Sequence, residues 1–414
     1  MRILIGGQTY APARNGQAVF TTHLAEGLAR RGHQVHVVLP SEHLRPYTVE
    51  HHGVTVHHLW AIPLTAFHPH AFLSPAPGGP LRHLLEEIRP QVIHVQDHYS
   101  LGQALVRLAQ ERGMPRIGTN HFVPANLAPY FRGLNRLGAL LEHMLWQWML
   151  GVFNRLDLVT APSRTAATLL RLQGCQVPVV PLSCGVDCGR FRPDPDVDRG
   201  FWRRRYGLAP QRTVFLFVGR VDPEKRLDVL LSALTRLPRE DLQLAIAGQG
   251  TDQERLQELA RRWGLADRVR FLGFVPDKEL PALLNSVDIF AMPSTAELLS
   301  IATLEAMACG RPVLAARALA LPELVQHRIN GRLFRPNDPD DAAAQMAWLT
   351  EHPEEWPRLS RAARTVAEAH CLEHTLQRYE ALYHQLCAAR LRGPSRAVTG
   401  PRPGPTHLDR APRC

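Results

Sequence analysis

Residues 295–310 read Thr-Ala-Glu-Leu-Leu-Ser-Ile-Ala-Thr-Leu-Glu-Ala-Met-Ala-Cys-Gly, and the fold prediction starts from this stretch. The apolar run 287–293 precedes it and ends in proline, so we expect a buried strand there. Apolar residues then recur at helical spacing up to Gly310, and Ser300 is suited to cap the amino end of this helix. The stretch therefore predicts a strand, a loop and a helix whose amino end can bind a phosphate group.

Two acidic residues of this stretch are candidates for a function. Glu297 falls in the predicted loop, and Glu305 falls inside the predicted helix, with seven residues between them. A carboxylate inside an otherwise apolar helix needs a polar partner, and a bound ligand can supply one. The alternative is an acidic residue at a helix start and a second one in contact with water, without any function. The stretch alone leaves both interpretations open.

Positive charge is predicted on a neighbouring loop. The apolar run 213–218 indicates a strand that ends in Gly219 and Arg220, and Lys225 follows just before a helical pattern. An arginine binds phosphate oxygens through a planar fork of donors, and a lysine binds them as a point charge. Arg220 and Lys225 are therefore candidates for binding a diphosphate, together with the helix end near Ser300.

In combination, these segments resemble the retaining glycosyltransferases of the two-Rossmann architecture, GT-B, whose motif is Glu, seven residues, Glu. The resemblance extends over about residues 1–390, with 321–325 and 330–334 as further matching segments. It implies two Rossmann-like, doubly wound parallel-sheet domains that face each other across a cleft. It also implies transfer of a hexose from a nucleotide-diphosphate sugar, with UDP or GDP as the leaving group, to an acceptor hydroxyl with retention of configuration.

Strands and helices alternate along the chain, which by itself predicts an α/β fold with parallel sheets. Ligands of such sheets lie at the carboxyl ends of the strands. We expect an acceptor-side domain at 1–186, a linker at 187–210, a nucleotide-sugar-binding domain at 211–370, a helix at 371–390 that returns to the first domain, and a disordered tail at 391–414.

The resemblance also implies roles for individual residues. It places Gly16 at the donor phosphate, His121 beside the donor sugar, Glu297 at the sugar hydroxyls and Glu305 at the ribose hydroxyls. The catalytic candidates are thus His121 and Glu297, together with the two cations of the preceding loop, Arg220 and Lys225. The other donor-binding candidates lie in two loops: Phe274 and Val275 near the nucleotide base, and Leu299, Ser300 and Ile301 at the helix end.

The sequence departs from the family pattern in two loops. Many members have a second glycine where this chain has Asn15, and many have Gly-Phe-Gly where it has Leu298-Leu299-Ser300. Glycine permits the backbone to approach a ligand closely. The loss of glycines therefore bears directly on how the backbone meets the sugar or the phosphates.

No metal site is predicted. The sequence contains neither H-E-x-x-H nor another metal-ligand spacing, and the pairs His51-His52 and His57-His58 are expected at the surface or at strand edges without a role. The segment Asp194-x-Asp196-x-Asp198 lies in a proline-rich linker and not at a strand end. We therefore expect no cofactor and no Mg²⁺, because the cations and the helix end can neutralise the leaving diphosphate.

The composition is typical of a soluble protein with two domains, with 45% hydrophobic and 21% charged residues over 414 positions. The formal net charge of +10 permits anionic partners, but no basic run carries the interleaved aromatic residues typical of nucleic-acid binding. The seven cysteines are scattered without zinc spacing, which indicates reduced thiols and a cytoplasmic protein. No segment is long and apolar enough to span a membrane.

One apolar segment is relevant to the identity of the acceptor. The segment 136–153 carries two tryptophans and follows Arg132, so it is either a core helix or a helix that lies on a lipid surface. The segments 15–16, 119–122 and 302–308 look most similar to the branch that glucosylates diacylglycerol. This resemblance implies UDP-glucose or a related donor and a lipid acceptor, and we expect a peripheral protein at the anionic inner face of the cytoplasmic membrane.

Other functions remain open from the sequence. The acceptor can instead be a soluble sugar or a polysaccharide. A nucleotide-sugar epimerase of the same architecture would consume the donor without an acceptor, and a sensor would bind the donor without turnover.

Overall fold

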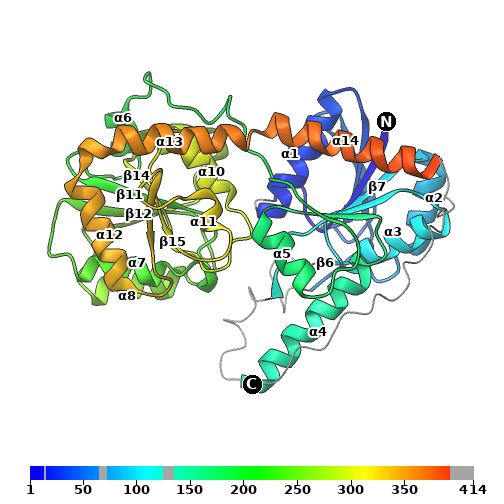
Figure 1. The fold of residues 1–414 in the computed structure, drawn as a ribbon, viewed down its shortest axis with the longest axis horizontal. Coiled ribbons are helices and arrows are strands. Elements are labelled where there is room, and N and C mark those ends of the chain that lie inside the picture. The colour runs from blue at the N-terminus through cyan, green and yellow to red at the C-terminus, as the bar shows by residue number, and fades with distance from the viewer. Residues whose placement is uncertain (14, 65–71, 125–134, 392–414) are drawn as a thin grey trace, which may run out of the picture.

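The computed structural model describes residues 1–391, except residue 14 and the segments 65–71 and 125–134. This part of the chain forms two α/β bodies side by side, each with a parallel sheet packed between helices (Figure 1). The predicted fold class, two Rossmann-like parallel-sheet domains, is confirmed. The expected disordered tail lies outside the described residues, apart from Leu391.

The first sheet has eight strands in the order β10-β9-β8-β7-β1-β2-β4-β3, and it is parallel except for β3 at the edge. Its central strands are buried apart from the first residues of β1 and β2, as runs of Val, Ile and Leu are when helices cover both faces of a sheet. The strands are β1 (Arg2–Gly6), β2 (Gln34–Pro40), β3 (Tyr47–His51), β4 (Val54–Leu59), β7 (Val92–Val95), β8 (Arg116–Thr119), β9 (Leu158–Ala161) and β10 (Val179–Pro181), with a separate antiparallel pair β5 (Ile62–Pro63) and β6 (Phe72–Leu73).

The helices of the first body follow the strands in alternation, as the sequence predicts. Two of them, beginning at Ser100 and Arg164, start within five residues of the carboxyl ends of β7 and β9, the side of the sheet where ligands bind in folds of this class. These helices are α1 (Gly16–Arg30), α2 (Gly78–Ile88), α3 (Ser100–Glu111), α4 (Asn135–Phe153) and α5 (Arg164–Leu172).

The second sheet has six parallel strands in the order β13-β12-β11-β14-β15-β16. The strands are β11 (Thr213–Val218), β12 (Leu242–Ala247), β13 (Val269–Gly273), β14 (Ile289–Met292), β15 (Val313–Ala316) and β16 (Gly331–Phe334). The helices around them are α6 (Arg199–Arg205), α7 (Leu227–Thr235), α8 (Gln253–Arg262), α9 (Leu280–Ser286), α10 (Ile301–Ala308), α11 (Leu321–Leu324), α12 (Pro339–Glu351) and α13 (Trp356–Ala369), with 3-10 turns η2 (Pro223–Lys225), η3 (Asp277–Glu279) and η4 (Pro353–Glu355).

The strand β12 ends at a position that only glycine can occupy. Gly248 has φ +139°, and a Cβ there would lie 1.8 Å from the carbonyl oxygen of Gly219. The close approach brings the ends of β11 and β12 together. It thereby fixes the start of the loop that carries Arg220.

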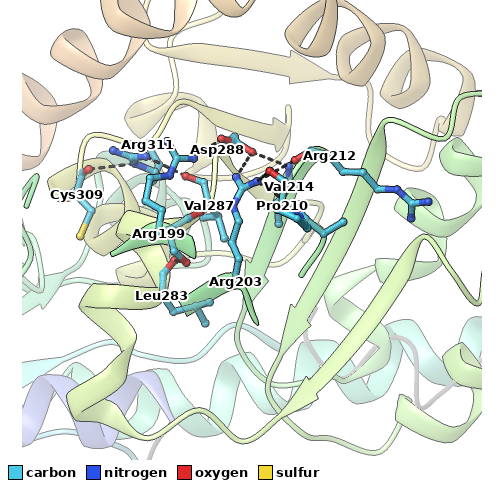
Figure 2. Close-up of polar contacts among 12 residues, drawn as sticks. Arg199, Arg203, Pro210, Arg212, Val214, Leu283, Val287, Asp288, Cys309 and Arg311 are labelled. Atoms are coloured by element: carbon cyan, nitrogen blue, oxygen red, sulfur yellow. Dashed lines mark hydrogen bonds and ion pairs between the residues drawn. The ribbon is translucent and has the colours of Figure 1, made fainter. Parts of the chain in front are cut away.

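Helix α6 lies within the stretch that we expect to link the domains, and a buried ion cluster ties it to the second sheet. Figure 2 shows Asp288 between Arg203 and Arg199, at 2.7 and 2.6 Å, while Asp288 also accepts a bond from the N–H of Val214 at 2.8 Å. Asp288 precedes β14 and Val214 is the second residue of β11, so the cluster lies at the amino ends of these strands. It stabilises the edge opposite to the one where a ligand is expected.

The chain passes between the two bodies twice, and the two passages are bonded to each other. The N–H of Val186 donates to His370 and the N–H of Leu372 donates to Val186, both at 2.9 Å. Gly185, with φ +78°, permits this contact, because a Cβ there would lie 2.8 Å from the Cα of Leu372. After this joint, α14 (Leu372–Leu391) runs across the first body (Figure 1). The domain limits given above stay predictions.

Candidate active site

The amino end of α1 forms one wall of the candidate site. The side-chain oxygen of Asn15 accepts a hydrogen bond from the N–H of Ala18 at 2.9 Å and another from the Thr9 hydroxyl at 3.2 Å. Gly16 is exposed, and a Cβ added there would meet no atom of the described chain within 4 Å. Asn15 thus caps the helix where many family members have a glycine, and the space beside Gly16 is open to a ligand.

His121 lies just beyond the carboxyl end of β8 and is held by two side chains. Its Nε2 lies 2.8 Å from Oε1 of Gln96, and its ring centroid lies 5.0 Å from that of Phe20. Burial lowers the pKa of His121 to about 3, so the ring is neutral at pH 7. Because Nε2 donates to Gln96, Nδ1 is the nitrogen that can accept a hydrogen bond from a ligand.

A chain of buried hydrogen bonds connects His121 with helix α14. Gln96 lies 3.2 Å from Nε2 of His94, whose Nδ1 lies 2.7 Å from the Tyr383 hydroxyl. Burial, and to a smaller extent the neighbouring His121, lowers the pKa of His94 to about 3. Tyr379, also on α14, makes a second buried hydrogen bond between this helix and the sheet, with the Thr160 hydroxyl at 2.9 Å. The returning helix therefore supports the floor of the site through polar contacts.

Asp97 and Gln17 are site residues that the sequence interpretation missed. The Asp97 carboxylate accepts a hydrogen bond from the Gln17 amide at 3.1 Å and another from the N–H of Tyr99 at 3.1 Å. Burial outweighs these bonds and raises the pKa of Asp97 to about 6. Its position directly after a buried strand was the available signal, because carboxyl ends of parallel strands meet at one edge of a sheet.

The predicted cations lie in the second body, after β11, and each contacts a carboxylate. Lys225 Nζ lies 2.6 Å from Oε1 of Glu297. Arg220 pairs instead with Asp222 and, at 2.8 Å, with Glu224. The structure therefore brings Lys225 and Glu297 together, while Arg220 is held by two acids of its own loop. A diphosphate would have to share both cations with these carboxylates.

The amino end of α10 forms the opposite wall, and Ser300 caps it as predicted. The Ser300 hydroxyl oxygen accepts bonds from the N–H of Thr303 at 3.3 Å and from the Thr303 hydroxyl at 2.8 Å. The first N–H groups of a helix have no partner within the helix. Ile301, the first residue of α10, can therefore offer its N–H to an anion.

The leucines that replace the family glycines connect the two bodies. Leu298 is 7% exposed and belongs to the apolar cluster of the first body that surrounds α3 and α4. Leu299 and Ile301 pack against the other apolar cluster of that body, which includes α1 and α14. Apolar side-chain contacts across the interface therefore hold the loop before α10 in place.

Glu305 is half-buried in α10, and its protonation differs from that of an ordinary carboxylate. Burial raises its pKa to about 8, opposed by the nearby Arg190 and assisted by Asp277. Arg190 donates to the carbonyl oxygen of Asp277 at 2.6 Å and lies 2.8 Å from its carboxylate. Arg190 and Asp277 were not predicted, because one lies in the expected linker and the other on a surface turn.

The remaining predicted donor residues follow the carboxyl end of β13. Phe274 is 47% exposed, and Val275 packs at the border of the second apolar core. Their assignment to the nucleotide base stays a prediction, as do the individual roles of the other candidates.

A direct contact between the bodies lies beside the site. The carboxylate of Glu323, on α11, accepts hydrogen bonds from the backbone N–H groups of Arg164 and Thr165 at 3.0 and 2.6 Å. These residues form the first turn of α5, where Ser163 caps the helix. Glu323 thus binds the positive end of a helix dipole that belongs to the other body.

Helix α4 has one buried face and one exposed face. Trp146 is 3% exposed and lies in the core, whereas Trp148 is 43% exposed and its ring packs edge-on against His98 at 4.6 Å. Leu140 and Met144 are 54% and 57% exposed and lie on the same face as Trp148, at intervals of four residues. Among the described residues, no helix has both the length and the apolar character that a membrane span requires.

Two family models match the chain in succession. Residues 14–190 match Glycosyltransferase Family 4, and residues 198–366 match Glycosyl transferases group 1. The first match covers the body with His121, and the second covers the body with Lys225, Glu297 and Glu305. The boundary between them falls at the first passage of the chain.

Curated relatives extend the similarity. A D-inositol 3-phosphate glycosyltransferase of Geodermatophilus obscurus is 32% identical over 93% of this chain and 88% of its own length, and one of Catenulispora acidiphila is 34% identical over 56% of this chain and 59% of its own. A GDP-mannose-dependent phosphatidylinositol monomannoside mannosyltransferase of Mycolicibacterium smegmatis is 37% identical over 51% of this chain and 57% of its own. These relatives are named for inositol phosphate and phosphatidylinositol mannoside, not for diacylglycerol, so they do not support the narrower resemblance.

Solved structures show the same fold. A sucrose-phosphate synthase of Thermosynechococcus elongatus superposes with a TM-score of 0.80 at 21% identity, over 94% of this chain and 99% of its own. HepE of Anabaena, solved with UDP-glucose, superposes with a TM-score of 0.75 at 22% identity, over 93% of this chain and 100% of its own. From the two successive family matches, the full-length relatives and this shared fold, it follows that the chain belongs to the group 1 glycosyltransferases of the GT-B fold.

Proposed function

We propose that the protein transfers a hexose from a UDP- or GDP-sugar to a hydroxyl of an inositol-phosphate headgroup, carried by a lipid at an anionic membrane surface. The observation that carries the donor side is the pair of Lys225 and Glu297, 2.6 Å apart, beside the capped amino end of α10. A lysine, a carboxylate and free helix N–H groups are the chemistry needed to bind a diphosphate on one side and sugar hydroxyls on the other.

The proposed catalysis rests on the leaving group. Arg220, Lys225 and the N–H groups of α10 stabilise the negative charge that develops on the departing diphosphate. Three such donors can replace a divalent cation, so the reaction is proposed to proceed without a metal. Glu305 then binds the ribose hydroxyls, and Glu297 orients the sugar.

The proposed stereochemistry is retention. The acceptor hydroxyl attacks the anomeric carbon on the face that the diphosphate leaves, and its proton passes to the leaving phosphate oxygen. The bond from carbon to the phosphate oxygen breaks as the bond to the acceptor oxygen forms, so no side chain has to accept the proton permanently. The neutral ring of His121 can then orient the sugar through Nδ1.

The proposed acceptor is supported by two independent observations. The relatives that match most of this chain act, by their names, on D-inositol 3-phosphate, and another acts on a phosphatidylinositol mannoside. The stripe of Leu140, Met144 and Trp148 on α4 exposes apolar surface of the kind that enters a lipid interface. A lipid-linked inositol phosphate as acceptor accounts for both observations. Its use as acceptor requires a peripheral protein at the cytoplasmic face of the membrane.

A product-mass screen tests the proposal. UDP- and GDP-sugars are offered with vesicles that contain phosphatidylinositol, with vesicles that contain diacylglycerol, or with soluble inositol 3-phosphate. We expect a hexose to be added in the phosphatidylinositol arm. A product only with soluble inositol phosphate or another sugar would overturn the lipid part and retain the transferase. Donor consumed without any acceptor would instead identify an epimerase.

A further inference from the structure

Glu26, His51 and His52 form a cluster at an edge of the first body. Glu26 lies on α1, His51 ends β3, and His52 begins the turn into β4. His51 pairs with Val54, the first residue of β4, so the turn lies at the amino ends of the parallel strands. The candidate active site lies at the carboxyl ends, and the cluster is therefore separate from it.

The three side chains have the separations that one metal ion requires. Nδ1 of His51 and Nδ1 of His52 both contact Oε1 of Glu26, at 3.1 and 3.0 Å. The possible ligand atoms all lie within 4.8 Å of one another. Around a tetrahedral ion with ligand distances of about 2.0–2.2 Å, neighbouring ligand atoms are about 3.3–3.6 Å apart.

The nitrogen of His51 is an unusual feature of this cluster. It is buried and makes no hydrogen bond within the described part of the chain, although it lies 3.1 Å from the Glu26 oxygen. The two atoms are close but not aligned for a hydrogen bond, and a buried polar atom without a partner is unfavourable. A cation between the nitrogen and the oxygen would satisfy both atoms.

The backbone of the turn brings the two histidines to one side. Neighbouring residues on a regular strand point to opposite faces of the sheet. His52 instead has φ +49°, in the left-handed region, and Gly53 follows with φ +80°. The two rings consequently lie with centroids 4.3 Å apart. A local conformation that histidine adopts only at some cost thus presents both imidazoles to Glu26.

We propose that Glu26, His51 and His52 bind one divalent transition-metal ion of the Zn²⁺ class, with water at the open position. Two imidazoles and one carboxylate are a donor set that suits such ions. Arg30 competes only weakly with a metal ion for Glu26. Its guanidinium lies 3.8 Å from the other carboxylate oxygen, and its side chain is 61% exposed. The ion ties α1 to the β3–β4 turn and plays no part in glycosyl transfer.

Metal titration of the full-length protein tests this site. Zn²⁺ is titrated by calorimetry, and Co²⁺ is added to record the visible absorption of a tetrahedral site. We expect one tight equivalent in the wild type, with Glu26→Gln lowering the affinity at least about tenfold, since even outer-shell substitutions have effects of that size. Glu42→Gln is the matched control, because Glu42 contacts His43 and His58 through different oxygens, at 3.7 and 3.2 Å.

A thermal readout keeps the test independent of folding defects. Saturating Zn²⁺ is expected to raise the Tm of the wild type and of Glu42→Gln but not of Glu26→Gln, because binding to the folded state alone stabilises it. His52→Asn provides a second variant at an exposed side chain with the same expectation as Glu26→Gln. Equal Zn²⁺ binding by the wild type and both site variants, or binding that only Glu42→Gln loses, would overturn the site.

Discussion

The fold keeps Glu305 protonated at pH 7, where an ordinary glutamate is ionised. Its pKa is raised to about 8 by burial, so its carboxyl group carries a proton at pH 7 in the free protein. An ionised carboxylate is the better acceptor for two ribose hydroxyls. Below pH 8, donor binding is therefore expected to release close to one proton, and affinity for the nucleotide should rise as the pH increases toward 8. Calorimetry in buffers of different ionisation enthalpy measures this release.

Glu305→Gln is the control for this expectation. The amide cannot ionise, so nucleotide affinity should be weaker and should no longer depend on pH between about 6 and 8. The same group has a predictable effect on stability. Its folded-state pKa lies above the ordinary value of 4.5, so the folded state binds more protons in this range and the free energy of unfolding falls as pH rises from about 4.5 to 8. Proton release that persists in Glu305→Gln would assign it to another group.

Lys225 is one of only two lysines in the sequence, and the other is Lys278. If Lys225 neutralises the leaving diphosphate, Lys225→Ala should lower kcat by about two to three orders of magnitude, as removal of one preorganised charge donor does in other enzymes. Lys278→Ala, on the exposed turn η3, should leave kcat unchanged. Steady-state kinetics with the donor identified by screening, and melting curves for both variants, distinguish chemistry from folding. Near wild-type turnover of a folded Lys225→Ala would remove the donor site proposed here.

Metal chelation examines the same charge balance. Arg220, Lys225 and the amino end of α10 provide the positive charge that Mg²⁺ supplies in many phosphoryl and glycosyl transfers. Saturating EDTA is therefore expected to leave at least about half of the transfer activity, measured as product formed per minute. A complete loss that Mg²⁺ or Mn²⁺ restores would mean that this balance is wrong.

Residues of this site differ in how far the sequence could identify them. Lys225, Glu297 and Ser300 stand at strand or helix ends with strong patterns around them, and the structure brings them to one edge of a sheet. Gln96 directly follows strand β7, so it carried the same signal as Asp97, although only the tertiary fold shows that it contacts His121. Arg190 was out of reach, because a linker arginine has no pattern of its own and only the tertiary fold brings it near Glu305.

At the scale of elements, helix α4 has one face that fits the core interpretation of its sequence and one exposed apolar face, for which contact with a lipid surface stays a prediction. Trp146 lies in the core, while Leu140 and Met144 are exposed. If the exposed face enters a lipid interface, Leu140→Gln combined with Met144→Gln should lower binding to anionic vesicles by about tenfold or more, since each buried apolar side chain contributes about 1.5–3 kcal/mol at most. Co-sedimentation at low and high salt measures the binding.

The control for α4 is Leu172→Gln, at the last residue of α5, a leucine that is 76% exposed. It removes one exposed apolar side chain from another surface and should not change vesicle binding. If the wild type and both variants bind vesicles equally, or if the wild type does not bind them at low salt, α4 does not meet the membrane and the lipid acceptor is unsupported.

Elements were predictable where hydrophobic periodicity is strong, and they were missed where it is not. The parallel strands are buried along both faces and read as continuous apolar runs. The edge strand β3 is mostly exposed and carries no such run, so its pairing with β4 could not be foreseen. Its turn is also the element that brings His51 and His52 toward α1.

At the scale of the whole molecule, the sequence predicted two bodies but not how they hold each other. The replacement of family glycines by Leu298 and Leu299 suggested a change of backbone approach to the ligand. In the structure these leucines insert into the apolar clusters of the opposite body. A pattern of substitutions in one loop cannot show which distant surface the new side chains will meet.

The hydrogen bonds between the two passages of the chain, at Val186 and Leu372, can act as a hinge about which one body rotates against the other. Val186 and Leu372 are bonded across the joint, so a rotation of one body against the other leaves their amides paired, whereas it separates Glu323 from Arg164 and Thr165. Hydrogen exchange can follow these amides individually. A saturating nucleotide-sugar is expected to slow exchange at Arg164 and Thr165 severalfold and to leave Val186 and Leu372 unchanged. Equal slowing of exchange at all four amides would mean that, without the donor, the joint opens together with the rest of the interface. The bodies would then not rotate about this joint.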